Sequence, residues 1–183
     1  MQESTTMGVR RFGRVNWLGM YTLIRREIAR FMTVWNQTIA APLVTAGLFL
    51  AVFSLAIGPR RGDVMGVPFI DFLAPGILMM TVIQNSFANA ASSIVSAKVM
   101  GNIVDTLMPP LSPLEILIGY VVGGAARGLF VALAIGVAAL LILGIEIQHP
   151  MWALLFVILG GVFMASLGVV AAIFANKFDQ MSA

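Results

Sequence analysis

The chain alternates long apolar runs with short polar interruptions, and this pattern predicts an all-α integral membrane protein. Four runs, at residues 38–57, 72–97, 116–143 and 151–175, contain one charged side chain among them. At about 1.5 Å per residue, a helix of roughly 20 residues crosses the roughly 30 Å hydrocarbon core of a bilayer. We therefore expect four transmembrane helices.

Residues 16–37, ahead of the first run, form an amphipathic pattern. Arg25, Arg26 and Arg30 lie on the polar side of this segment, where they would meet anionic lipid. The apolar side chains recur at helical spacings of three and four: Trp17, Tyr21, Ile24, Ile28, Phe31 and Trp35. We expect a helix in the membrane interface, and the alternative is a helix buried against a partner domain.

A single transmembrane domain is expected to cover the chain. It would comprise a flexible cytoplasmic tail (1–15), the interfacial helix (16–37), the four-span bundle (38–175) and a cytoplasmic end (176–183). Six arginines precede the first run, whereas the next loop holds two of the eleven Lys and Arg residues. Because positive charge accumulates on the cytoplasmic side, we expect a multi-pass inner-membrane protein with a cytoplasmic amino terminus.

The composition excludes a soluble domain and several kinds of site. The chain is 60% hydrophobic and 10% charged, with a mean hydropathy of +0.97, whereas soluble domains are about 25% charged. There is no cysteine, and His149 is the one histidine, so we expect no metal and no cofactor. The net charge of +3 arises largely before the first run, where membrane lipid accounts for it, so no nucleic-acid partner is expected.

The second span contains polar residues on one helical stripe. Thr81, Asn85, Asn89, Ser92 and Ser96 follow spacings of four, four, three and four. This stripe would line a translocation path or a dimer seam, or it would supply hydrogen bonds between helices. Pro75 is expected in the first turn of the same helix, where its missing N–H is tolerated.

The third span contains Arg127 and two rows of small residues. A central Arg costs about 2.5 to 3.5 kcal/mol, which the apolar residues of the span outweigh. We expect Arg127 to lie near the inner headgroups and snorkel; the alternative is an inward position contacting an anionic lipid or a glycan phosphate. The small residues are expected to serve close packing: Gly124, Gly128, Ala132 and Gly136 in one row, Gly119 and Gly123 in the other.

The polar segment between the second and third spans, residues 98–115, predicts a helix, a stop and a capped restart. Apolar residues recur at helical spacing over 99–108, and Pro109 and Pro110 end that helix. Ser112 is placed as an N-cap, Pro113 at the first helical position and Glu115 at the third, which together form a capping box.

This segment resembles the loop between spans two and three of type-two ABC transporter permeases. The resemblance is carried by Lys98-x-x-Gly101, by Leu107-x-x-Pro110-Leu111-Ser112-Pro113-x-Glu115, by Phe72-Leu73-Ala74-Pro75-Gly76 and by Asn176-Lys177-Phe178-Asp179-Gln180. It implies that residues 99–108 are a cytoplasmic coupling helix that docks on a separate ATPase subunit. The implied coupling residues are Gly101, Asn102, Asp105, Leu107, Pro109 and Pro110. An amphipathic connector lying on the headgroups is the alternative.

The function expected from the resemblance is that of a membrane-spanning permease subunit of an ABC exporter, paired with a second permease subunit in a homodimer. The chain is not expected to be an enzyme, because its 183 residues contain no G-x-x-x-x-G-K-[ST] phosphate loop. A secondary transporter, a channel subunit, an intramembrane enzyme and a membrane scaffold are the alternatives. Permeases of the family normally have six spans, so a chain that stops after four is expected to be truncated. Thr81, Asn85, Asn89, Ser92 and Arg127 are the candidate path-lining residues.

Overall fold

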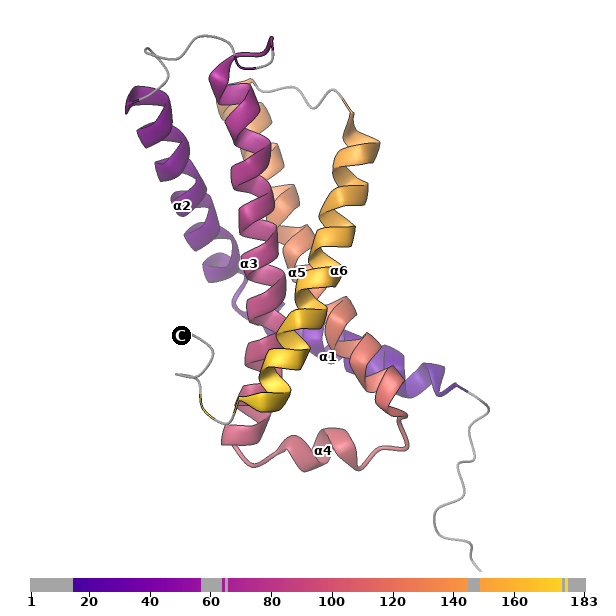
Figure 1. The fold of residues 1–183 in the computed structure, drawn as a ribbon. Coiled ribbons are helices and arrows are strands. Elements are labelled where there is room, and N and C mark those ends of the chain that lie inside the picture. Colours follow the sequence, from indigo (N-terminus) through magenta and orange to yellow (C-terminus); the bar gives the residue numbers. More distant parts are fainter. Residues whose placement is uncertain (1–14, 57–63, 65, 145–148, 176, 178–183) are drawn as a thin grey trace, which may run out of the picture.

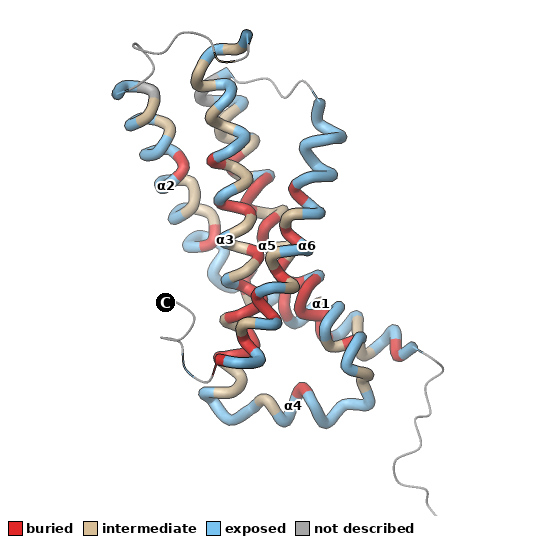
Figure 2. The backbone as a smooth tube through the Cα atoms, in the orientation of Figure 1, coloured by how far each residue is buried: buried red, intermediate tan, exposed pale blue. Residues whose placement is uncertain are grey.

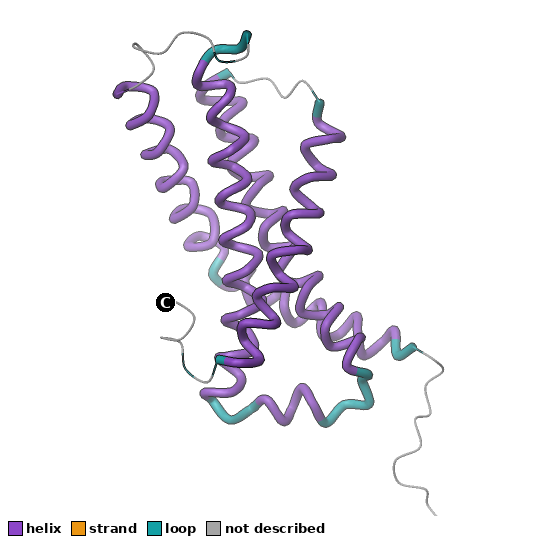
Figure 3. Tube along the Cα trace, in the orientation of Figure 1, coloured by secondary structure: helices purple, strands orange, loops and turns teal. Residues whose placement is uncertain are grey.

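The computed structural model describes residues 15–56, 64, 66–144, 149–175 and 177. Every named element in these residues is a helix (Figure 1; Figure 3). In chain order they are α1 (Trp17–Thr33), α2 (Trp35–Ala56), α3 (Phe69–Val99), α4 (Ile103–Leu107), α5 (Pro113–Ala138), its π-helical continuation η2 (Ala139–Leu143) and α6 (Pro150–Phe174).

Four of these helices are long and apolar enough to cross a membrane, which confirms the predicted fold class. The candidate spans are Trp35–Phe53, Phe69–Val99, Pro113–Leu141 and Pro150–Phe174. In Figure 1 the four helices run along a common direction, α1 crosses the bundle near one end, and α4 lies beyond that same end.

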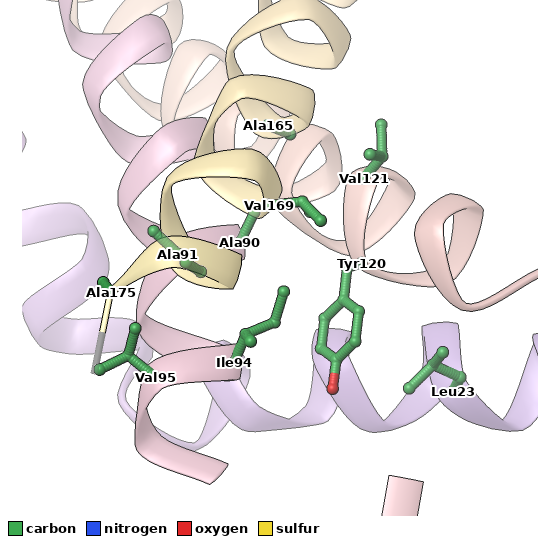
Figure 4. Close-up of a cluster of buried hydrophobic side chains, with 11 residues drawn as sticks. Leu23, Ala90, Ala91, Ile94, Val95, Tyr120, Val121, Ala165, Val169 and Ala175 are labelled. Atoms are coloured by element: carbon green, nitrogen blue, oxygen red, sulfur yellow. The ribbon is translucent and has the colours of Figure 1, made fainter. Parts of the chain in front are cut away.

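The buried core lies where α3, α5 and α6 cross close to α1 (Figure 2). Alanine and valine side chains dominate this cluster, and Tyr120 and Leu23 extend it to α1 (Figure 4). The outward faces of α2 and α6 are largely exposed, as expected for surfaces that meet lipid rather than water.

The two glycine rows of α5 receive two different sets of neighbours. A Cβ added at Gly124 would lie 2.8 Å from Ala165 Cβ and 2.9 Å from the Ser86 carbonyl oxygen, so this row accommodates α3 and α6. A Cβ added at Gly123 would lie 2.5 Å from Glu27 Cβ, so the second row accommodates α1. Both contacts need glycine, which supports the packing interpretation of these rows.

Several helix boundaries differ from the predicted ones. The expected interfacial segment 16–37 divides at Val34, so that α1 ends at Thr33 and Trp35 belongs to α2. Pro75 lies inside α3 and not in its first turn, because α3 begins at Phe69.

The expected coupling helix 99–108 is shorter than predicted. The backbone at Gly101 is left-handed, with φ of 74°, which ends α3 after Val99 and lets α4 begin only at Ile103.

Candidate translocation and coupling site

The restart of the helix after α4 has the predicted capping box. Ser112 is the N-cap of α5, its hydroxyl accepts from the Glu115 N–H at 3.4 Å, and Glu115 Oε2 accepts from the Ser112 N–H at 2.7 Å. The other carboxylate oxygen of Glu115 accepts from the Asn16 N–H, also at 2.7 Å. The cap therefore also fixes the start of α1, since Asn16 is the N-cap residue of that helix.

The exposed side of the α4 loop is largely apolar. Leu107 is 61% exposed and Met108 77% exposed, and Val104 lies beside them on the surface. All six implied coupling residues are exposed: Gly101, Asn102, Asp105, Leu107, Pro109 and Pro110. An exposed apolar face on a short helix outside the bundle is a surface on which another protein can dock.

The opposite side of α4 faces α1 through Thr106, which is 4% exposed. Its hydroxyl accepts a hydrogen bond from Arg26, and the Pro110 carbonyl accepts a second one from Asn16 Nδ2 at 3.4 Å. The α4 loop is therefore tied to α1 as well as to α3 and α5, its neighbours in the chain.

Two of the α1 arginines pair with a buried carboxylate that the sequence pattern did not indicate. Arg26 and Arg30 both approach the carboxylate of Glu27, at 3.3 and 3.4 Å, and Glu27 is 1% exposed. Glu27 lies on the buried face of α1 with Leu23 and Phe31, because Gly123 of α5 lets that face approach. Glu27 and the two partly exposed arginines thus form an ionic cluster around a buried carboxylate.

The polar stripe of α3 divides into two functional parts. Asn89 is fully buried and accepts from Arg30 Nη2 at 2.8 Å through Oδ1 and at 2.9 Å through its carbonyl. The Ser92 hydroxyl donates to the Asn89 carbonyl at 3.3 Å. Asn89 thus contacts α1, whereas the hydrogen bond of Ser92 stays within α3.

The upper part of the stripe, Thr81 and Asn85, lines a cavity of about 440 Å³ between α2 and α3, which Arg127 of α5 also lines. The structure thus brings three of the five candidate path residues together and directs Asn89 and Ser92 elsewhere. The remaining lining residues are Val34, Gln37, Thr38, Ala41, Pro42, Thr45, Ala46, Phe49, Ile77, Met80 and Gln84.

Arg127 faces the cavity that it lines together with residues of α2 and α3. Its Nε is buried and has no hydrogen-bond partner, and no contact of its guanidinium with a carboxylate occurs among the described residues. This cation is under-compensated because it has no partner among these residues. Burying a charge without a partner is costly.

Sequence reasoning did not single out several residues that shape this site. Glu27 was not predicted to be buried, because a single acid between arginines on an amphipathic helix is expected to face solvent. Pro42 lies inside α2 and cannot donate to the Thr38 carbonyl, which leaves that oxygen at the cavity without its helical partner. Ser86 is fully buried where α3 crosses Gly128 of α5 and Gly161 of α6. The sequence indicated close packing at this crossing only through the glycines.

Comparisons with known proteins give one consistent family. A family model described as ABC-2 type transporter matches residues 19–183. The inner membrane transport permease YadH of Escherichia coli K12 is 36% identical over 166 residues, which cover 91% of this chain and 65% of that protein. The YadH permeases of Escherichia coli O157:H7 and Shigella flexneri match with the same identity and coverage. The chain therefore spans a little less than two thirds of the length of these relatives. No solved structure matches the chain.

Proposed function

Because the chain belongs to the ABC-2 type transporter family, we propose that it is the membrane-spanning permease subunit of an ABC exporter. In this role it forms part of a translocation path and couples to a separate ATPase subunit, which hydrolyses the ATP. The observation that carries the proposal is the α4 loop, which presents an apolar outer face while its inner face is hydrogen-bonded to α1.

The proposed path runs along the cavity lined by Thr81, Asn85 and Arg127. The buried Nε of Arg127 has no hydrogen-bond partner among the described residues, and a cation in that position suits a passage for a polar or charged group. A second permease subunit, in a homodimer, would complete the path.

The proposed orientation places α1, α4 and the amino terminus in the cytoplasm of the cell and the α5–α6 connection outside. It is supported by the Arg-rich start of the chain and by the position of α1 and α4 at one end of the bundle (Figure 1). Single cysteines at Asn102 and His149 test it on intact cells with a membrane-impermeant thiol reagent. His149→Cys should react and Asn102→Cys should not; the reverse result would invert the topology and remove the coupling role.

The decisive experiment charges the outer face of α4. Leu107→Glu should reduce co-purification with an ABC ATPase from native membranes, because a carboxylate replaces an apolar side chain that is 61% exposed. Leu107→Met keeps the face apolar and is the matched control. The ATPase is identified by mass spectrometry, and insertion of both variants is checked by membrane fractionation.

Substrate-stimulated ATP hydrolysis gives a second readout for the same pair of variants. We expect a loss of at least about tenfold in Leu107→Glu, as for truncation of a central interface residue, and parental activity in Leu107→Met. Parental assembly and hydrolysis in Leu107→Glu would show that α4 is a connector, and the proposed coupling role would be wrong.

A further inference from the structure

We propose that the cavity between α2, α3 and α5 binds an amphiphile with an anionic head group, held by the Arg127 guanidinium. The proposal rests on the proposed function, because it names the chemical class of molecule that would enter the path. It stands on three features of the cavity: an under-compensated cation, a polar-to-apolar gradient along its length, and its volume.

No carboxylate among the described residues pairs with Arg127, so an anion that balances its charge would come from elsewhere. Arg127 is the one charged residue among those that line the cavity, and its Nε has no hydrogen-bond partner. The nearest buried carboxylate, Glu27, is already shared between Arg26 and Arg30. Three arginines thus accompany one carboxylate at this level of the bundle, and an anionic ligand would balance the excess.

The cavity is polar at one end and apolar at the other. The helices α2 and α3 run in opposite directions (Figure 1), so the start of α2 lies beside the later part of α3. Gln37, Gln84 and Asn85 therefore gather at the α1 end, the end at which Gly123, one turn before Arg127, contacts Glu27 of α1. Phe49 lines the cavity toward the other end.

The threonines between these two ends present little polarity to a ligand. Thr45 Oγ1 donates to the Ala41 carbonyl at 2.9 Å and Thr81 Oγ1 donates to the Ile77 carbonyl at 2.7 Å, so both hydroxyls are satisfied within their own helices. The middle of the cavity is then lined mainly by methyl and methylene groups, with Met80 and Ile77 beside them. This arrangement suits an acyl or other apolar tail behind a charged head.

The volume favours an amphiphile over a simple ion. About 440 Å³ falls within the range of roughly 300 to 1,000 Å³ that is typical of pockets for drug-sized ligands, far more than one phosphate needs. The shared chemistry is an anionic oxygen cluster such as a phosphate, which a guanidinium binds in a forked geometry. That cluster could belong to a resident lipid, to a transported amphiphile or to a soluble phosphate compound.

Native mass spectrometry of the full chain released from nanodiscs tests the site without any ATPase. The probes are phosphatidylglycerol, which is anionic, and phosphatidylcholine, which is zwitterionic. The parental chain and Arg127→Lys should retain phosphatidylglycerol, and Arg127→Gln should retain about tenfold less, since a charge-assisted contact is lost. Lys177→Gln removes an exposed cation outside the cavity and should match the parental chain.

Two results would overturn the proposal. One is equal retention of phosphatidylglycerol by Arg127→Gln and the parental chain, when thermal unfolding shows that both proteins are folded. The other is no preference of the parental chain for phosphatidylglycerol over phosphatidylcholine, as expected if a carboxylate of another polypeptide segment already partners Arg127.

Further arms identify the source of the anion. Competition by millimolar inorganic phosphate would show that the head group suffices and would overturn the amphiphile assignment; absence of competition supports it. A second assay uses vesicles that contain the transporter and its ATPase. ATP-dependent movement of fluorescent phosphatidylglycerol to the other leaflet assigns the amphiphile as cargo, whereas phosphatidylglycerol that stays bound to the chain is assigned as a resident lipid. Both outcomes support the site. Leu107→Glu should abolish the movement and leave binding unchanged, which separates failure of the site from failure of the coupling role.

Discussion

Nη1 of Arg26 donates a hydrogen bond of 3.0 Å to Oγ1 of Thr106, joining α1 to α4 across 80 residues of sequence. The same guanidinium reaches the Tyr120 hydroxyl of α5 at 3.2 Å and the Glu27 carboxylate at 3.3 Å. One side chain therefore contacts α4, α5 and the carboxylate of Glu27. We expect a displacement of α4 to be transmitted through Arg26 to α1 and α5.

The first prediction removes only the hydroxyl at the α1–α4 contact. Thr106→Val keeps the volume of a buried side chain but leaves Arg26 without this acceptor, and we expect about 1 kcal/mol of coupling, or roughly fivefold, to be lost. The measurement is substrate-stimulated ATP hydrolysis by the assembled transporter. Thr22→Val is the control, because the Thr22 hydroxyl is exposed and bonds within α1 at 2.8 Å. Equal stimulation in both variants would mean that the contact is structural only.

The second prediction concerns the buried carboxylate of Glu27. Glu27→Ala should destabilise the chain by about 2 kcal/mol, because Arg26 and Arg30 would then face each other without their shared anion. The expected loss is smaller than the roughly 3 to 5 kcal/mol of a fully buried pair, since the two arginine side chains are 48% and 36% exposed.

Thermal unfolding in detergent, followed by circular dichroism, measures this effect. Glu27→Gln should fall between Glu27→Ala and the parental chain, because the amide oxygen can still accept hydrogen bonds. A Glu27→Ala variant as stable as the parental chain would show that the cluster contributes nothing to stability.

The features that the sequence predicted well are those set within a few neighbouring residues. Hydropathy over roughly 20 residues is enough to locate a span, because the bilayer imposes the length. The capping box of Ser112 and Glu115 needs only residues that lie three positions apart, so it too was readable.

The features that were missed depend on contacts between distant segments. The partner of Asn89 is Arg30, 59 residues away, and no periodicity in α3 indicates that partner. Glu27 is buried only because Gly123 of α5 has no side chain at the crossing. The position of Arg127 at the cavity similarly depends on how α2 stands beside α3, which hydropathy does not encode.

The third prediction compares two glycines of the same row on α5. Gly124→Ala should destabilise the chain by about 1 to 3 kcal/mol, because the new Cβ would meet Ala165 Cβ and the Ser86 carbonyl oxygen at 2.8 and 2.9 Å. Gly136→Ala adds the same methyl group where nothing lies within 4 Å, so we expect it to be neutral or slightly stabilising through helix propensity. Thermal unfolding of both variants gives the comparison, and similar losses at the two positions would contradict the packing interpretation.

The last prediction concerns Lys98, whose Nζ caps the end of α6. It donates to the carbonyls of Ala172, Ile173 and Ala175 at 2.7, 2.8 and 3.1 Å. The last carbonyls of a helix lack intrahelical partners and carry partial negative charge, so an ammonium there satisfies both needs. This contact joins the end of α3 to the end of α6, next to the start of the α4 loop.

Lys98→Met keeps the length of the side chain and removes its charge and donors. We expect the amide protons of the last turn of α6 to exchange about tenfold faster, as follows from the loss of roughly 1.4 kcal/mol of local stability. Hydrogen exchange with mass spectrometry on a peptide covering residues 165–175 measures this, and a peptide from the middle of α5 should be unchanged. Lys177→Met is the control, because Lys177 is exposed. Faster exchange in both variants would point to a general charge effect at this end of the bundle. An effect in Lys98→Met alone follows from the three hydrogen bonds that this side chain donates to the carbonyls of Ala172, Ile173 and Ala175.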